Sequence, residues 1–245
     1  MAGHGPDAAG ARTGRRVRSG LKPTNGRNKT NGRAIFSAVN ALTATSKGAA
    51  TREAIIDRAY GIACAAGLEG LSIGPLAQAV GMSKSGVFAH FGSREDLQMA
   101  VLDEAGVRFV DHVLRPALKH PRGLARLRAI LEAWYDWVRQ SEGSCLLLSA
   151  ASEYDDRPGP LRDRLVAHDL RWRQEIARAI TLAVDTGELA GDTDPDQMAF
   201  ELYALALIVH HDAGLFGFDT AANRGRRAME RLFRSYAPSA AAPDA

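Results

Sequence analysis

The sequence predicts an all-α fold over residues 51–237. From residue 51 onward apolar residues recur at spacings of three and four, while sustained polar–apolar alternation and Asn-Gly hairpin signals do not occur there. Glycine and proline residues interrupt this pattern at intervals typical of short helices. Hydrophobic residues form 46% and charged residues 24% of the 245 residues, an ordinary globular composition. The chain is long enough for one large domain or two small ones.

The first 50 residues differ in composition from the rest. They contain nine lysine and arginine residues and one acid, a net charge of +8, whereas residues 51–245 carry −5. Few large apolar side chains precede Ile35, so we expect this tail to be disordered. Two interpretations stay open: a basic arm that follows DNA phosphates or enters a minor groove, and a dispensable extension upstream of the true start.

Residues that cap helix N-termini define the first part of the helical region. Four helices are expected there: 51–66 capped by Thr51, 73–80 capped by Ser72, 84–90 capped by Ser83, and a fourth capped by Ser93 that runs to about Leu118. Asp96 lies in the first turn of the fourth helix, where the helix dipole favours an acid. Gly67 and Gly81 supply the first two breaks.

Five further helices are expected after residue 120. Their predicted spans are from Pro121 to about 140, 145–154, 160–186, from Pro195 onward, and 220–236. The helix that begins at Pro195 has two apolar faces, one formed by Met198, Leu202, Leu205 and Val209 and the other by Phe200, Tyr203 and Leu207. Such a helix must be covered on two sides, so we expect a partner subunit to cover one of them.

The stretch LSIGPLAQAVGMSKSGVFAHFGSREDL, residues 71–97, places two short helices around a glycine. In a helix-turn-helix, the second helix enters the major groove, and its groove-facing residues are small or polar. Ser83, Lys84, Ser85 and Gly86 fit that requirement. On the pattern alone, a plain helical corner without a DNA function remains an equal alternative.

Residues 52–98 resemble the DNA-binding domain of the TetR (tetracycline-repressor) family of transcriptional regulators. The resemblance rests on AQAVGMSKSGVFAHFGSREDL, which matches the family pattern without gaps. It implies a helix-turn-helix domain at 51–98, a helical effector-binding and dimerisation domain at 99–237, and a loose tail at 238–245. It further implies a cytoplasmic repressor that binds a palindromic operator in double-stranded DNA as a homodimer, paired through about 195–236, and is released by a small molecule.

The resemblance also implies which residues contact DNA. The candidates are Ser72, Ser83, Lys84, Ser85, Gly86, Phe88, His90 and Arg94. By motif position, Ser72 contacts phosphate, Lys84 and Ser85 reach bases or phosphates, and His90 touches the backbone. Phe88 occupies the position of a tyrosine whose hydroxyl commonly bonds phosphate, so that contact is lost or made by another group.

An effector pocket is expected among the middle helices. Aromatic and polar side chains suited to its lining are Trp134, Tyr135, Trp137, Cys145, Tyr154, Trp172, Tyr203 and His210. The alternative is that each of them belongs to the hydrophobic core, since an aromatic stripe at helical spacing commonly does. Hydrophobic or aromatic compounds are the default expectation for the effector.

Other functional classes find little support in the sequence. His210, His211 and Asp212 are consecutive and therefore diverge around a helix instead of converging on a metal. Phosphate-binding glycine loops and G-x-S-x-G elbows do not occur, so we expect no enzyme activity, cofactor or metal. The longest apolar run, 199–209, is about half of a membrane span. Cys64 and Cys145 are expected to be buried free thiols, and a helical interaction protein that does not bind DNA remains the alternative function.

Overall fold

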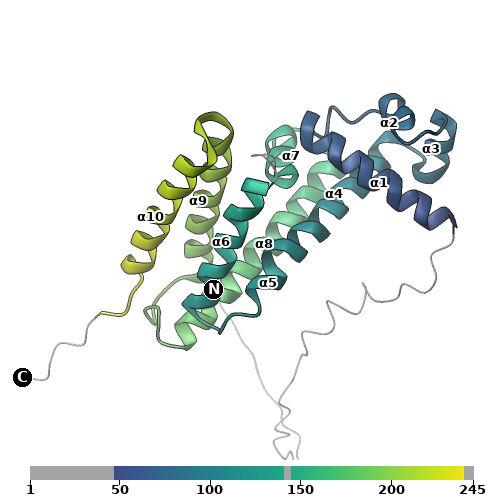
Figure 1. The fold of residues 1–245 in the computed structure, drawn as a ribbon. Helices are drawn as coiled ribbons and strands as arrows, with labels where there is room; N and C mark the ends of the chain where they lie inside the picture. Colours follow the sequence, from purple (N-terminus) through teal and green to yellow (C-terminus); the bar gives the residue numbers. More distant parts are fainter. Residues whose placement is uncertain (1–46, 141–144, 240–245) are drawn as a thin grey trace, which may run out of the picture. The chain divides into compact units, whose positions relative to one another are not determined.

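The computed structural model describes residues 47–140 and 145–239, and every regular element within these ranges is helical (Figure 1). Of the predicted disordered basic tail, residues 1–50, residues 1–46 lie outside the described residues, and residues 47–50 are helical as the start of α1. The first three helices are α1 (Lys47–Ala66), α2 (Ile73–Ala79) and α3 (Lys84–Phe91). We call them, together with the start of α4 (Arg94–Phe109), the head.

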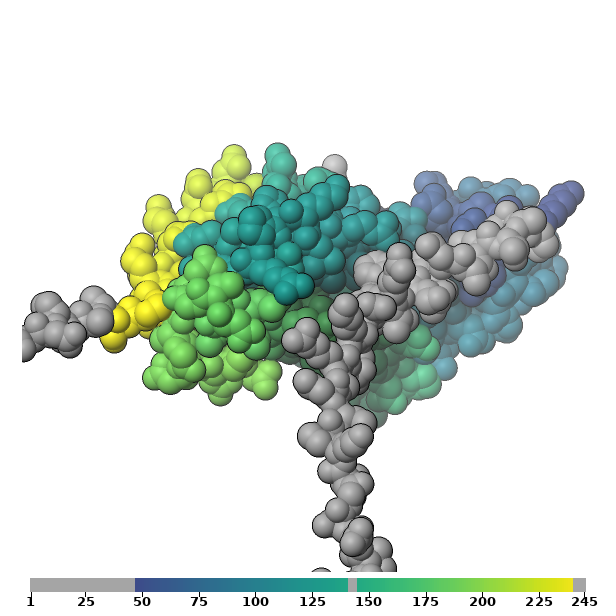
Figure 2. Space-filling view, turned by 90° about the horizontal axis from the view of Figure 1, so that it is seen from below, coloured from purple at the N-terminus to yellow at the C-terminus, as the bar shows by residue number. Residues whose placement is uncertain are grey.

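The remaining helices form the body. They are the π-helical turn η1 (Val110–Leu114), α5 (Arg115–Ala117), α6 (Leu124–Gln140), α7 (Leu146–Tyr154), α8 (Pro160–Asp185), α9 (Pro195–Phe216) and α10 (Phe218–Ser235). Helix α9 packs against α6, α8 and α10, and Figure 2 shows α10 in yellow at the surface of the body. The all-α fold class is confirmed.

Helix starts that the local sequence specifies agree with the structure. The Ser83 Oγ accepts a hydrogen bond from the Gly86 N–H at 3.1 Å, and the Ser93 Oγ accepts one from the Asp96 N–H at 3.0 Å. At α9 the Asp194 carboxylate accepts hydrogen bonds from the N–H groups of Asp196 and Gln197, and Pro195 occupies the first helical position. These caps fix where the short helices of the head begin.

Two predicted helix starts and one predicted capping bond are wrong. Helix α1 begins at Lys47, and Thr51 is not its N-cap, because the Thr51 hydroxyl donates to the Lys47 carbonyl inside the helix at 2.9 Å. Ser72 occupies the N-cap position of α2, but its side chain makes no capping bond. Helix α6 begins at Leu124, not at Pro121, because the Glu188 carboxylate accepts from the Leu124 N–H at 3.0 Å.

Two clusters of buried side chains hold the fold together. The head cluster contains Ile55, Leu76, Val87 and Leu97, among others, and it is completed by residues of α7 and α8 such as Leu146. The body cluster is built by the end of α4, η1, α5, α6, α7, α8, α9 and α10. Because α4 runs through residue 98 and α7 closes the head cluster, the head is packed on the body without an intervening linker.

Helix α9 is the only helix in the described ranges with the length and hydropathy of a membrane span, at 22 residues and a mean hydropathy of 1.2. Core helices of globular proteins also meet this criterion. On the first predicted apolar face, Met198, Leu202 and Val209 are buried in the body cluster, and Leu205 is partly buried against it. On the second face Phe200 and Leu207 are exposed, while Tyr203 is half-buried.

Candidate DNA-binding site

The turn between α2 and α3 depends on a glycine. Gly81 has a φ of 66°, which lies in the left-handed region that favours glycine. The Met82 N–H donates to the Ala77 carbonyl at 2.9 Å, so the chain folds back immediately after α2. The turn therefore sets α3 at a fixed angle to α2, as a helix-turn-helix requires.

Helix α3 is anchored on one side and open on the other. Val87 and Phe91 are buried in the head cluster. At about 100° per residue, the exposed residues of α3 form one continuous arc beside this buried stripe. They are Lys84, Ser85, Phe88 and Ala89, which we call the α3 face. Three of these four were candidates from sequence; Ala89 was not, although its place on the arc follows from helical spacing.

The hydroxyl groups of the two serines at the start of α3 lie within hydrogen-bonding distance of each other. The Ser83 Oγ caps the helix and also lies 3.0 Å from the Ser85 Oγ. A Cβ added at Gly86 would lie 3.2 Å from the Met82 Cε, so this glycine permits close packing of the turn. Ser83 and Gly86 thus shape the start of α3, whereas Ser85 keeps an exposed hydroxyl.

Lys84 lies across the first turn of α2. A Cβ added at Gly74 would lie 3.3 Å from the Lys84 Cε and 3.6 Å from its Nζ. Lys84 is exposed, and no acid within the described residues pairs with it. Its ammonium group is therefore free to meet a phosphate or a base edge, and Gly74 gives its stem room.

Arg94 does not point freely to solvent. Its Nε donates to the Leu71 carbonyl at 2.8 Å, and its other nitrogen bonds the Glu69 carbonyl and, at 3.0 Å, the Glu69 carboxylate. The predicted DNA contact of Arg94 competes with these bonds, which tie α4 to the α1–α2 connection. Of the other candidates, Ser72 and His90 are half-buried, and the His90 ring lies 6.4 Å from that of Phe91.

A polar cluster joins this connection to α7. The Glu153 carboxylate accepts from the backbone N–H groups of Leu68 and Glu69 at 3.1 and 2.9 Å. The Tyr154 hydroxyl donates to the Glu69 carboxylate at 2.6 Å. Hydrogen bonds from Tyr154 and Arg94 hold the pKa of Glu69 below its usual value. We call this group the α7 latch, since it fastens the head to the body.

The predicted pocket residues divide between the two clusters. Trp134 and Trp172 pack edge-to-face with Phe109 and with each other, and Tyr203 packs edge-to-face with Trp134, with ring centroids 4.7–5.6 Å apart. Of the rest of the set, Tyr135, Trp137 and Cys145 belong to the body cluster, and the His210 Nε2 accepts from the Cys145 N–H at 3.1 Å. Tyr154 belongs to the head cluster and the latch, so placing it with the others was wrong.

Polar atoms in the aromatic cluster lack partners. The indole N–H groups of Trp134 and Trp172 are buried and have no acceptor within the described part of the chain. Burial lowers the pKa of His210, with a further lowering by His211, so His210 stays neutral at pH 7. Cys64 is half-buried and Cys145 is buried, and neither forms a disulfide; burial raises the pKa of each thiol.

A short exposed helix held by a glycine turn, on a larger helical body with a buried aromatic cluster, defines a helix-turn-helix regulator. Comparison with known proteins agrees. Residues 55–101 match the family model of bacterial regulatory proteins of the tetR family, and residues 123–229 match that of the tetracyclin repressor-like C-terminal domain. The two matches together cover more than half of the chain.

The chain belongs to the TetR family of transcriptional regulators. Like other members it is a DNA-binding regulator that responds to a ligand, and the expectation that it is not an enzyme is confirmed by membership of this non-enzymatic family. No curated protein sequence matches the chain.

Solved structures of regulators share its fold. A TetR-family regulator from Cytophaga hutchinsonii is 21% identical, with a TM-score of 0.70 over 80% of this chain and 98% of that one. One from Chloroflexus aurantiacus is 25% identical, with a TM-score of 0.62 over 77% and 94%. AibR, solved with isovaleryl coenzyme A and operator DNA, is 22% identical, with a TM-score of 0.59 over 76% and 98%.

Proposed function

We propose that the chain binds a palindromic operator as a homodimer, represses transcription there, and is released by a small molecule. The observation that supports this most directly is the α3 face, an open surface on a short helix whose other side is buried. Lys84 and Ser85 supply donors for phosphates or base edges, and α3 has the dimensions that fit a major groove. Operator DNA lies in the cytoplasm, which is the proposed location.

Selection of bound fragments from the whole genome tests this proposal. Footprints on the recovered fragments should show palindromes whose half-sites lie about 34 Å apart, one turn of DNA. Transcription from the adjacent promoter should rise when the protein is absent. Failure to retain any genomic fragment would instead favour a helical interaction protein that does not bind DNA.

The apolar side of α9 that the body does not cover is the proposed dimer surface. Phe200, Leu207, Ile208, Leu215 and Phe216 are all exposed. Exposure of so many large apolar side chains on one helix marks an interaction surface. A second copy of the chain is the occupant that fits best. If α9 of one copy packs on α9 of the other, the dimer presents two heads to one DNA duplex.

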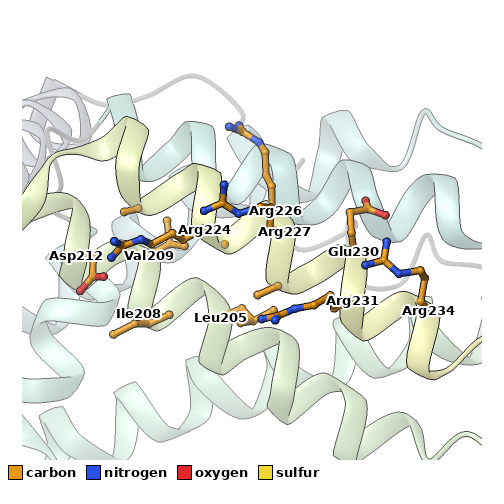
Figure 3. Close-up of a pocket in the computed structure, with 13 residues that line it drawn as sticks. Leu205, Ile208, Val209, Asp212, Arg224, Arg226, Arg227, Glu230, Arg231 and Arg234 are labelled. Carbon is orange, nitrogen blue, oxygen red and sulfur yellow. The ribbon is translucent and has the colours of Figure 1, made fainter.

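A groove between α9 and α10 continues this surface. It has a volume of about 750 Å³; α9 contributes Leu205, Ile208 and Val209 to it, and α10 contributes a row of arginines (Figure 3). Of these, Arg226 is paired with Glu132 of α6 at 2.8 Å. The apolar floor suits a helix of the partner, and the arginines at its edge can bond to backbone carbonyls or acids of that partner.

The effector site is proposed at the aromatic cluster of Phe109, Trp134, Trp172 and Tyr203. Its two indole N–H groups without acceptors favour an apolar molecule that carries a hydrogen-bond acceptor. The π-helical turn that starts directly after Phe109 is a feature often found at functional sites. AibR was solved with isovaleryl coenzyme A and a Saccharomonospora viridis regulator with choline, so this fold accepts chemically different ligands.

Tryptophan fluorescence provides the test of the effector site. Compounds should be screened for a change in emission and then for release of the operator fragment. A true effector should do both, and Trp172→Phe should weaken its binding because one N–H donor is removed. Release of DNA by a compound whose affinity is unchanged in Trp172→Phe would place the site elsewhere.

A further inference from the structure

The α3 face is more apolar than a surface that binds phosphates needs to be. Phe88 is 43% exposed, and it is the only large apolar side chain exposed in the head as far as the structure describes it. At about 100° per residue, it lies on the arc between Lys84 and Ser85, with Ala89 beside Ser85. Half of the α3 face is therefore an exposed phenyl ring and a methyl group.

The position of Phe88 separates it from ordinary exposed apolar residues. Single apolar side chains on a surface need no explanation. Phe88, however, is one turn along the helix from Lys84, the unpaired cation of the α3 face, and its own helix is held with that face outward by Val87 and Phe91. If α3 enters a major groove, the phenyl ring enters with it.

The major groove offers one apolar group that such a ring can recognise. Each thymine presents a C5-methyl group there, while the edges of the other bases present hydrogen-bond donors and acceptors but no methyl group. A phenyl ring has no hydroxyl for a phosphate, so its favourable contact in the groove is with that methyl. A phenyl ring packed against the donors and acceptors of a base edge would leave those groups without hydrogen-bond partners, which is unfavourable.

We propose that Phe88 recognises the C5-methyl group of a thymine in each operator half-site. The inference rests on the proposed function, and it assigns to Phe88 a role in sequence selection. Ala89 lies beyond Ser85 at the end of the same arc, where its methyl group adds little bulk. Lys84, on the other side of the ring, is then directed to a neighbouring base or phosphate.

Replacement of thymine by deoxyuridine in the operator tests the proposal with the unaltered protein. The change removes the C5-methyl group and leaves all donors and acceptors in place. At one thymine per half-site, the affinity should fall about fourfold for each lost methyl contact. At other thymines of the half-site the affinity should not change. An affinity that is insensitive at every thymine, in an operator that the protein does bind, would overturn the proposal.

Variants of Phe88 then show whether this residue senses the methyl. Phe88→Ala should bind the thymine operator at least fourfold more weakly and should no longer distinguish it from the deoxyuridine operator. Phe88→Tyr, which keeps the ring, should retain the distinction. The matched control is Leu170→Ala, since Leu170 is exposed on α8 of the body, and it should behave as wild type.

The outcomes separate this proposal from the one on which it rests. If Phe88→Ala weakens binding but keeps the full sensitivity to deoxyuridine, the ring packs on the DNA backbone and the methyl contact is excluded. If the chain binds no operator at all, the proposed function itself fails. Because Phe88 is exposed, Phe88→Ala should fold, and its circular dichroism and melting temperature check this.

Discussion

Lys84 and Arg94 carry the same charge, but of the two only Arg94 is paired within the described part of the chain. Lys84 is exposed and has no acid beside it, whereas Arg94 is held by Glu69 and two carbonyls. We therefore expect Lys84→Ala to weaken operator binding by about 1–3 kcal/mol if the ammonium reaches a base. If the ammonium reaches only a phosphate, the loss of affinity should be similar for all DNA sequences. The slope of log affinity against log salt concentration should then become shallower by about one. Fluorescence anisotropy at several salt concentrations measures both.

Two variants serve as controls for Lys84. Lys119→Ala removes an exposed lysine between α5 and α6 and should leave operator affinity unchanged. Arg94→Ala should reduce the stability of the fold, because it breaks the bonds between α4 and the α1–α2 connection. Equal operator affinity for Lys84→Ala and wild type would remove Lys84 from the site.

Tyr154 and Tyr135 both have buried hydroxyl groups, but only that of Tyr154 has a partner. It donates to Glu69, whereas the Tyr135 hydroxyl has none among the described residues. Tyr154→Phe should cost about 1 kcal/mol at pH 7, less than a fully buried bond to a charged group, because Glu69 is nearly half exposed. Tyr135→Phe should be neutral or slightly stabilising. Urea unfolding of both variants measures this.

The cost of Tyr154→Phe should depend on pH. The pKa of Glu69 is lowered in the fold, first by its bond from Tyr154 and then by that from Arg94. The stabilisation by this carboxylate is therefore present above its usual pKa of 4.5 and is lost as the pH falls through the lower pKa of the folded state. The difference between Tyr154→Phe and wild type should shrink over that window. A difference that stays constant with pH would assign the loss to packing instead of the hydrogen bond.

At the scale of the helices, α4 and α8 approach closely at a glycine. A Cβ added at Gly106 would lie 2.7 Å from the His168 Cε1. Gly106→Ala should therefore destabilise the fold by about 1–3 kcal/mol, because the ring or the helix must shift. Gly61 lies in α1 with no atom within 4 Å of its added Cβ, so Gly61→Ala should stabilise by about 0.5–1 kcal/mol. Thermal unfolding compares the two.

The same pair of glycines separates packing from helix propensity. Propensity alone would make both alanine variants more stable than wild type. A stabilising Gly106→Ala would mean that His168 moves aside at little cost. Since α4 passes from head to body, a shift at Gly106 should also change operator affinity, which Gly61→Ala should not do.

The helices show which features could be predicted from the sequence. Ser83, Ser93 and Asp194 cap helices through bonds to N–H groups two or three residues away, so their local sequence was sufficient. The start of α6 depends on Glu188, which is 64 residues distant, and the pairing of Arg94 with Glu69 spans 25 residues. Such tertiary contacts leave no local pattern, which is why the role of Arg94 and the separation of Tyr154 from the other pocket candidates were not foreseen.

For the candidate DNA-binding site too, the local features were predicted from the sequence and the tertiary contacts were not. The turn at Gly81 and the outward position of Lys84 and Ser85 were expected from the break at this glycine and from the small or polar character of these residues, whereas the outward position of Phe88 was implied only by the family resemblance. The α7 latch was not expected, because Glu153 and Leu68 are 85 residues apart. The sequence therefore indicated the surface that meets DNA, and the structure added how that surface is fastened to the body.

At the scale of the whole molecule, the second face of α9 carries large apolar side chains that the described residues leave exposed. Phe200 is 58% and Leu207 42% exposed. Phe200→Glu combined with Leu207→Glu should leave the monomer folded, because neither side chain is buried in it. The charges should prevent a second copy from covering α9, because a carboxylate without a partner is costly in an apolar interface. Sedimentation should then show a monomer where the wild type is a dimer.

The loss of the dimer should also appear in DNA binding. One head on a half-site lacks the effective concentration that its linked partner provides, so affinity for the full palindrome should fall by about a hundredfold or more. Affinity for an isolated half-site should stay the same, since α3 is untouched. Leu170→Glu, an equally exposed leucine on α8, controls for the added charge and should remain dimeric. A double variant that still sediments as a dimer would move the interface away from α9, and it would leave the exposed face of this helix to a different partner.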